Sequence, residues 1–201
     1  TQTRGIDVAV STVILTLRRS EDGAAVLALP LVLRTREPFA DQWALPGGWL
    51  TPAESPVDAA ARTLAETTGL TPSYLEQLYA FGAVDRSPTR VVSIVYWALV
   101  RAEGDAAAVD GENVAWFPAD ALPELAFDHR EIIDYALSRL RAKLVYSPIA
   151  HAFLPDEFTL AELREVYEAV HGKPFDPANF RRQILATGDI EPTGRKLAGT
   201  N

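Results

Sequence analysis

A glycine followed by spaced carboxylates and an arginine is the part of this sequence best suited to chemistry. After Gly48 come five residues and a glutamate, then seven more residues and the segment 62–70, which reads R-T-L-A-E-T-T-G-L. On a helix, positions 63, 66 and 67 share one face, and three carboxylates there would converge on a divalent cation. Thr63 and Thr67 supply hydroxyls instead, so we expect at most a weak, vestigial metal site at Glu66.

This spacing resembles the Nudix box, whose family pattern is G, five residues, E, seven residues, then R-E-U-x-E-E-x-G-U with U aliphatic. The preceding Trp43-Ala-Leu-Pro-Gly-Gly48 is similar to the family's W-x-L-P-G-G lead-in. The resemblance implies a nucleotide-binding α/β/α sandwich, in which Mg²⁺ would polarise a pyrophosphate. With two carboxylates missing, we expect hydrolase activity to be lost, no cofactor to be required, and Mg²⁺ to bind weakly.

Simpler interpretations of the same residues stay open. Asp58, Arg62 and Glu66 stand at i, i+4 and i+8, which is also the spacing of a solvated ion-pair stripe on a helix. Gly47 and Gly48 could form only a tight turn.

Flanking segments supply further candidates for a ligand pocket. Arginine forks pair with phosphate oxygens, and either Trp43 or Phe39 could stack on an adenine ring. The segment 127–129, Phe-Asp-His, resembles one found in ADP-ribose-directed Nudix proteins, although its aspartate could equally cap the next helix. The predicted ligand-binding residues are Arg34, Arg36, Trp43, Gly47, Gly48, Arg62, Glu66 and His129.

The surrounding pattern is that of an α/β domain. Apolar and β-branched runs predict strands at 7–17, 24–34, 78–84 and 91–100, and Pro30 predicts a break or an edge position in the second of them. Ser55, Pro56 and Gly69 delimit a helix over 56–68, and a second helix is expected over about 129–146. Strands with a helix on each side imply an α/β/α sandwich.

Length and composition set further limits. A chain of 201 residues accommodates one large and one small domain, which we place at 1–146 and 147–201. The net charge of −8 argues against indiscriminate binding of nucleic acid, so any DNA contact must be local. The absence of cysteine excludes disulfides and zinc bound by thiolates. With no apolar run long enough to cross a bilayer and no signal segment, we expect a cytoplasmic protein without a membrane partner.

The C-terminal part predicts a winged helix-turn-helix. A capping box at 159–162 begins a helix that ends at Gly172, and Asp176-Pro177 begins another that ends at Gly188. Residues 190–196 form a basic hairpin candidate for the wing, which we expect to be truncated because the chain ends at Asn201. Asn and Gln pair with adenine, Arg with guanine, and Arg or Lys with phosphate. The predicted DNA-binding residues are Thr159, Asn179, Arg181, Arg182, Gln183 and Lys196.

The segments 158–168 and 175–182 resemble the C-terminal domain of the Nudix-related transcriptional regulators known as NrtR. That resemblance implies a homodimeric repressor that binds a palindromic operator near NAD-biosynthesis genes and is released by ADP-ribose or a related nucleotide. The alternatives are a metal-dependent Nudix hydrolase of ADP-ribose with an accessory domain, and an adaptor whose C-terminal helices bind protein.

Overall fold

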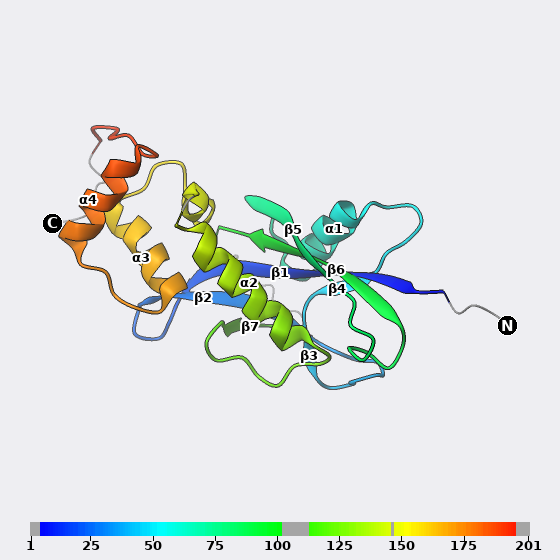
Figure 1. Ribbon diagram of the computed structural model, residues 1–201. Helices are drawn as coiled ribbons and strands as arrows, with labels where there is room; N and C mark the ends of the chain where they lie inside the picture. Colours follow the sequence, from blue (N-terminus) through cyan, green and yellow to red (C-terminus); the bar gives the residue numbers. More distant parts are fainter. Residues whose placement is uncertain (1–4, 102–112, 146, 196–201) are drawn as a thin grey trace.

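The computed structural model describes residues 5–101, 113–145 and 147–195. It has a seven-stranded sheet, two helices packed against it, and three further helical segments at the C-terminal end (Figure 1). The elements in chain order are β1 (Asp7–Arg19), β2 (Ala25–Leu33), β3 (Trp43–Ala44), β4 (Gly47–Trp49), α1 (Pro56–Thr68), β5 (Tyr74–Phe81), β6 (Val91–Leu99), β7 (Val114–Pro118), α2 (His129–Lys143), η2 (Pro148–Phe153), α3 (Leu160–His171) and α4 (Pro177–Thr187).

The sheet is built around β1. This strand pairs in parallel with β6 and antiparallel with both β2 and β4, so the strand order is β3-β2-β1-β6-β5, with β4 added to β1 and β7 added to β2. The long β1–β6 ladder fixes the register of the whole sheet. It also places β4, which carries the two glycines of the box, directly against the central strand.

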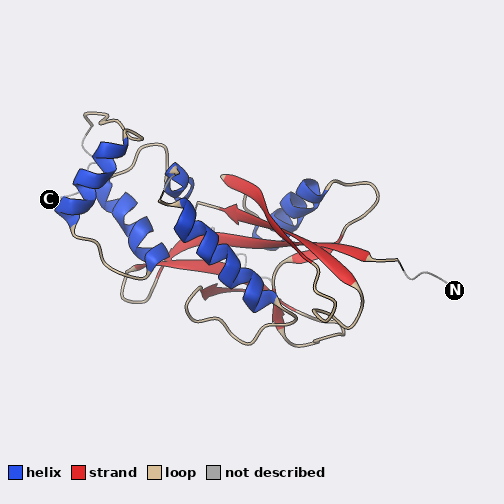
Figure 2. Cartoon of the chain, viewed as in Figure 1, coloured by secondary structure: helices blue, strands red, loops and turns tan. Residues whose placement is uncertain are grey.

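Side chains that alternate along β1 contact helices on both faces of the sheet, which explains the three layers of the fold. Val13 and Leu15 point into the core that includes Ile132 of α2, whereas Ile14 packs with Leu64 of α1 on the opposite face. Successive side chains of a strand face opposite sides of the sheet, so a strand that is apolar on both sides is buried only if each face of the sheet is covered by a helix. Figure 2 shows the strands running between α1 and α2. The predicted α/β/α sandwich is confirmed.

Local sequence sets the ends of α1. The Ser55 hydroxyl accepts a hydrogen bond from the Asp58 backbone N–H, and the Asp58 carboxylate accepts one from the Ser55 N–H, which completes a capping box. Gly69, in the left-handed conformation with φ of 67°, ends the helix. This part of the chain matches the prediction closely.

Other elements differ from the prediction. β5 covers 74–81 rather than 78–84, and β3, β4 and β7 were not predicted because each has five residues or fewer. Pro30 does not break β2: it lies beyond the residues that pair with β1, opposite Trp116 of β7. A proline is tolerated there because β1 does not need its missing N–H.

The C-terminal helices share one core with the sheet domain. Leu163 and Val166 of α3 and Phe180 of α4 belong to the same buried cluster as Leu137 and Leu140 of α2. This module lies at the end of the molecule opposite the N-terminus (Figure 1). Residues 190–195, the described part of the predicted wing, contain no strand. Among the residues that the structure describes, no helix is long and apolar enough to cross a membrane.

Candidate functional site

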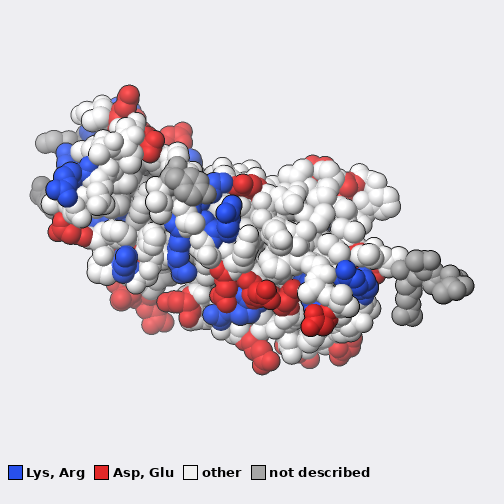
Figure 3. Space-filling model, in the orientation of Figure 1, with Lys and Arg blue, Asp and Glu red and all other residues white. Residues whose placement is uncertain are grey.

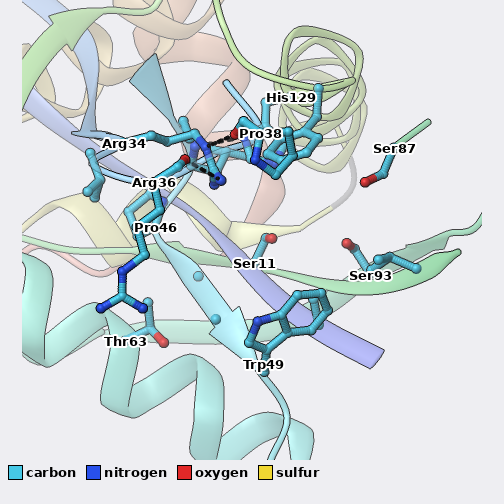
Figure 4. Close-up of a pocket in the computed structure, with 18 of the residues that line it drawn as sticks. Ser11, Arg34, Arg36, Pro38, Pro46, Trp49, Thr63, Ser87, Ser93 and His129 are labelled. Atoms are coloured by element: carbon cyan, nitrogen blue, oxygen red, sulfur yellow. Dashed lines mark hydrogen bonds between the residues drawn. The ribbon is translucent and has the colours of Figure 1, made fainter. Parts of the chain in front are cut away.

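A cavity of about 520 Å³ opens between β1, β4 and α1 on one side and the segments 34–38, 86–89 and 127–129 on the other. Figure 4 shows Arg34, Arg36 and His129 on one wall, with Thr63 and Trp49 facing them from α1 and β4. The structure brings seven of the eight predicted ligand-binding residues to this cavity: Arg34, Arg36, Gly47, Gly48, Arg62, Glu66 and His129.

The two glycines of β4 have different roles. A Cβ on Gly47 would lie 2.6 Å from the carbonyl oxygen of Val10, so β4 can pair this closely with β1 only if this residue is glycine. At Gly48, no atom of the described residues lies within 4 Å of a Cβ position, so its missing side chain leaves open space at the cavity. Gly47 therefore allows β4 to pack closely against β1, whereas Gly48 leaves part of the cavity open.

His129 begins α2 and is fixed in one tautomer. Its Nδ1 accepts a hydrogen bond from the Leu45 N–H at 2.9 Å, so in the neutral ring Nε2 carries the proton. The pKa of His129 is lowered to about 4, chiefly by burial; the Asp128 charge opposes this shift, and the Arg86 and Arg34 charges add to it. The side chain therefore offers the cavity a neutral N–H donor at physiological pH.

Arg34 supports the loop that forms one wall of the cavity. Its Nε donates to the Pro38 carbonyl at 2.9 Å, its Nη2 donates to the Arg36 carbonyl at 3.2 Å, and its guanidinium lies 4.7 Å from the Phe127 ring centroid. These contacts hold the guanidinium in a single position at the cavity wall. Arg36, in contrast, is exposed and points its own cation into the same space (Figure 4).

The carboxylates of the box are held by an arginine. Arg62 donates from Nε and Nη2 to the two oxygens of Glu54, each at 3.1 Å, and from Nη1 to Glu66 at 3.2 Å. These hydrogen bonds hold the pKa of the Glu54 carboxyl below its usual range and raise that of Arg62. The stripe predicted as an alternative thus exists in part, because Arg62 joins Glu66 while Asp58 turns back to cap the helix.

This donor set does not fit Mg²⁺. Thr63 and Thr67 are buried at the cavity wall and offer neutral hydroxyls, and the two carboxylates of the box, Glu54 and Glu66, pair with Arg62. Within the described residues, no group of three or more His, Cys, Asp or Glu side chains could hold a metal ion. A hard divalent cation needs several anionic oxygens, which this helix face lacks.

A second candidate surface lies on α4. Phe180 and Ile184 are buried against α3, while Asn179, Arg181, Arg182 and Gln183 are exposed. Arg182 Nη2 donates to the Asn179 side-chain oxygen at 2.6 Å, so these two side chains are aligned along one outer edge of the helix. Figure 3 shows blue side chains at the end of the molecule that α4 occupies, with red ones beside them. The exposed chemistry of α4 suits the major groove of DNA.

The helix-turn-helix is fixed by caps and aromatic packing. Tyr167 of α3 packs edge-on against Phe180 of α4 with ring centroids 5.2 Å apart, and Phe175 in the turn lies 6.3 Å from Tyr167. The Thr159 hydroxyl caps α3 by accepting from the Glu162 N–H at 3.1 Å, which gives this predicted phosphate contact a structural task as well. Lys196 lies outside the described residues.

Comparison with known proteins supports both parts of the chain. The family model of the NUDIX domain matches residues 8–136, and that of the NrtR DNA-binding winged helix domain matches residues 150–201. The ADPR responsive transcriptional repressor NtrR of Acinetobacter baylyi is 33% identical over 180 residues, which are 86% of this chain and 72% of the relative. The chain belongs to the NrtR family.

Solved structures of this NrtR family resemble the chain in both parts. Shewanella oneidensis NrtR complexed with a 27mer DNA is 33% identical with a TM-score of 0.80, and the match covers 96% of this chain and 89% of that one. The NUDIX domain of the same protein complexed with ADP ribose is also 33% identical, with a TM-score of 0.57, covering 69% of this chain and 90% of that one.

The predicted ligand contact Trp43 lies away from the cavity of this NrtR-family chain. It is not among the described residues that line the cavity, because its ring packs edge-on against Phe117 with centroids 4.9 Å apart. Trp49, which follows Gly48 on β4, lines the cavity instead and is 59% exposed. The sequence signal for Trp49 was weak, since only the pairing of β4 with β1 shows which way this side chain faces.

Sequence reasoning also missed Arg86. It lies between β5 and β6 and lines the cavity, yet its side chain is only 5% exposed. Its guanidinium makes two hydrogen bonds to Asp128 and one to Ser93. No local pattern marks this arginine, because its partners lie on β6 and just before α2.

Proposed function

We propose that this chain is an ADP-ribose-responsive transcriptional repressor. The observation that carries the proposal is the combination, in one continuous core, of a cation-lined cavity without a metal-binding carboxylate cluster among the described residues and a helix-turn-helix with an exposed polar α4. NrtR of Shewanella oneidensis, which the chain resembles over both parts, has been solved with DNA and, as its NUDIX domain, with ADP ribose.

The cavity suits a nucleoside diphosphate linked to a sugar. Arg34 and Arg36 would face the pyrophosphate, since guanidinium groups pair with two oxygens at once. The neutral His129 would donate its Nε2–H to a phosphate or ribose oxygen. Trp49, exposed at the rim, offers a flat surface on which the adenine could stack.

We propose that this ligand is bound and not hydrolysed. The hydroxyls of Thr63 and Thr67 and the pairing of Glu66 with Arg62 leave little anionic oxygen for Mg²⁺, so the ligand persists as an effector and no cofactor is needed. Arg62 would hold the wall of the cavity in shape. Glu66 is then a remnant of a metal site.

Operator binding would use α4 in the major groove. Asn179, Arg182 and Gln183, which are exposed, would reach base edges, whereas Arg181 and Thr159 would contact phosphates. Because one small module covers a short half-site, we propose a homodimer on a palindromic operator. The net charge of −8 favours a protein that binds DNA only through this local surface.

Regulation follows if the ligand binds a DNA-incompetent arrangement more tightly than the DNA-competent one. ADP-ribose derives from NAD, so we propose that the operators lie near NAD-biosynthesis genes and that ADP-ribose lifts repression. A protein that binds operator DNA works where the chromosome lies, and we propose the cytoplasm. The two working units would be residues 1–146 and 147–201.

Fluorescence anisotropy on labelled promoter fragments, titrated with ADP-ribose, tests this function. We expect specific binding that weakens as ADP-ribose is added, while AMP at the same concentration has less effect because it lacks the second phosphate. A specific complex that ADP-ribose leaves unchanged would refute antirepression.

A parallel incubation with Mg²⁺ and ADP-ribose tests the loss of catalysis. Release of AMP at about 1 per second or faster, an ordinary enzymatic rate, would instead favour a hydrolase.

A further inference from the structure

The carboxylate just before α2 is in an unusual arrangement. Asp128 occupies the N-cap position, yet in the described segment 113–145 its side chain makes no hydrogen bond to the first turn of α2. At the other three α-helices, the N-cap side chains of Ser55, Thr159 and Asp176 all bond to their helices, with ψ of 159°, 157° and 124°. Asp128 has ψ of 20°, so its backbone is outside the capping conformation.

Arg86 holds this carboxylate away from the helix. Its Nε donates to Asp128 Oδ2 at 2.8 Å and its Nη2 donates to Oδ1 at 2.7 Å, which is a two-pronged pairing. A third bond, from Nη1 to Ser93 Oγ at 2.9 Å, fixes the guanidinium against β6. The preceding residue, Phe127, has a positive φ of 57°, which is unfavourable for a bulky side chain. Residues 127–128, just before α2, thus combine an unfavourable φ with a carboxylate that is held away from the helix.

Arg86 also faces the space where the ligand would bind. It lines the cavity beside His129, and a guanidinium fork fits a phosphate as well as it fits a carboxylate. A diphosphate in the cavity would therefore compete with Asp128 for the same N–H groups. The carboxylate released by this competition has another partner close by, because the first-turn N–H groups of α2 and the positive end of the helix dipole favour an anion.

We propose that Arg86 and Asp128 form a ligand-responsive clamp, in which a bound diphosphate takes the Arg86 fork and the freed Asp128 carboxylate caps α2. This inference rests on the proposed function, since it names the residues through which ADP-ribose acts. The exchange rotates Asp128 toward the capping conformation and relieves the positive φ of Phe127. Arg86 is a positioning residue, whose contact with the ligand changes the start of α2.

The far end of α2 reaches the DNA-binding module. Arg141 Nε donates to the Val170 carbonyl of α3 at 3.0 Å, and Leu137 and Leu140 are buried in one cluster with Val166. Figure 1 shows α2 extending from the region of β3 toward α3. A helix packed at both ends moves largely as one body, so a change in its first turn alters the support of α3.

Two substitutions test the clamp by effects of opposite sign. Arg86→Gln removes the fork, so ADP-ribose should bind about 10-fold more weakly or worse in calorimetry. Asp128→Asn removes the competing charge and should tighten ADP-ribose binding. Because deleting any negative charge near the cavity favours an anion, Glu37→Gln is the matched control: Glu37 also lines the cavity but is not a partner of Arg86 in the clamp. Asp128→Asn should tighten binding more than this control does.

Operator affinity gives the second readout. Without ligand, Arg86→Gln should bind operator more weakly than wild type because Asp128 is then free to cap, and added ADP-ribose should change that affinity by a smaller factor. Hydrogen exchange of the wild-type protein gives a third readout that needs no variant. ADP-ribose should slow exchange of the Arg130 and Glu131 amides, the positions that a capping side chain bonds.

The outcomes separate the clamp from the proposed function. Weaker ADP-ribose binding in both variants, or unchanged exchange at residues 130–131, overturns the clamp. If wild type binds ADP-ribose but its operator affinity does not change, the proposed repression switch is wrong. The clamp is then still tested by ligand affinity, which should fall in Arg86→Gln and rise in Asp128→Asn. If wild type does not bind ADP-ribose at all, both are overturned.

Discussion

Replacing His129 with glutamine should remove a pH-dependent loss of stability. The imidazole is buried and neutral: its Nδ1 accepts the Leu45 N–H, and burial, reinforced by the Arg86 and Arg34 charges, lowers its pKa from 6.5 to about 4. In the unfolded chain the same group takes up a proton near pH 6.5. Between these two pKa values the unfolded state binds more protons, so the free energy of unfolding falls as the pH falls.

The size of the effect follows from the shift. The full difference between the two pKa values corresponds to about 3 kcal/mol, reached near pH 4, and about 2 kcal/mol of it is lost by pH 5. Above about pH 7 the contribution of this group to the pH dependence vanishes. Glutamine can still accept the Leu45 N–H through its side-chain oxygen, but it does not titrate.

Urea unfolding of wild type and His129→Gln at pH 7.5, 6 and 5 measures this difference. We expect the wild type to lose about 2 kcal/mol more than the variant between pH 7.5 and pH 5. Every other side chain is common to the two proteins, so the comparison isolates the contribution of His129. Parallel pH dependences in the two proteins would refute the reasoning, because they would show that His129 is already accessible to protons in the folded state.

Three further experiments with substituted proteins test the site and the DNA surface. Gly47→Ala should lower the free energy of unfolding by about 1–3 kcal/mol, whereas Gly48→Ala, which meets no described atom, should change it little; equal losses would contradict the packing role. Arg182→Ala should weaken operator binding about 10-fold and leave ADP-ribose affinity unchanged, and unaltered operator affinity would remove it from the interface. Thr63→Glu with Thr67→Glu adds two carboxylates to the cavity wall and should raise Mg²⁺ affinity in calorimetry, so an unchanged affinity would argue against this account of the lost metal site.

Prediction from sequence succeeded where the signal is local. The limits of α1 follow from Ser55, Pro56 and Gly69, whose effects act within one turn of helix. The family and the layered fold are confirmed as well, because the box and the C-terminal segments are contiguous motifs. The shift of β5 to 74–81 shows where the signal ends, since its limits depend on pairing with β6 rather than on its own residues.

The residues of the site likewise divide into those that local sequence predicts and those that only the tertiary structure shows. The choice between Trp43 and Trp49 could not be made from sequence, because both aromatic rings flank the glycines and only the sheet pairing shows which one faces the cavity. Arg86 carries no motif at all, and its partner Asp128 lies 42 residues away in the chain. Asp128 itself was open to two interpretations, as part of a ligand segment or as a helix cap.

The sequence by itself determined that this chain has a Nudix scaffold, whose box lacks two of the three metal-binding carboxylates, followed by a DNA-binding module. Both parts are encoded by residues close together in the chain. Tertiary structure decided which side chains join the two. It placed Arg86 against Asp128 at one end of α2 and Arg141 against Val170 at the other. Such pairings depend on how the chain returns on itself, and neither helix periodicity nor residue spacing contains that information.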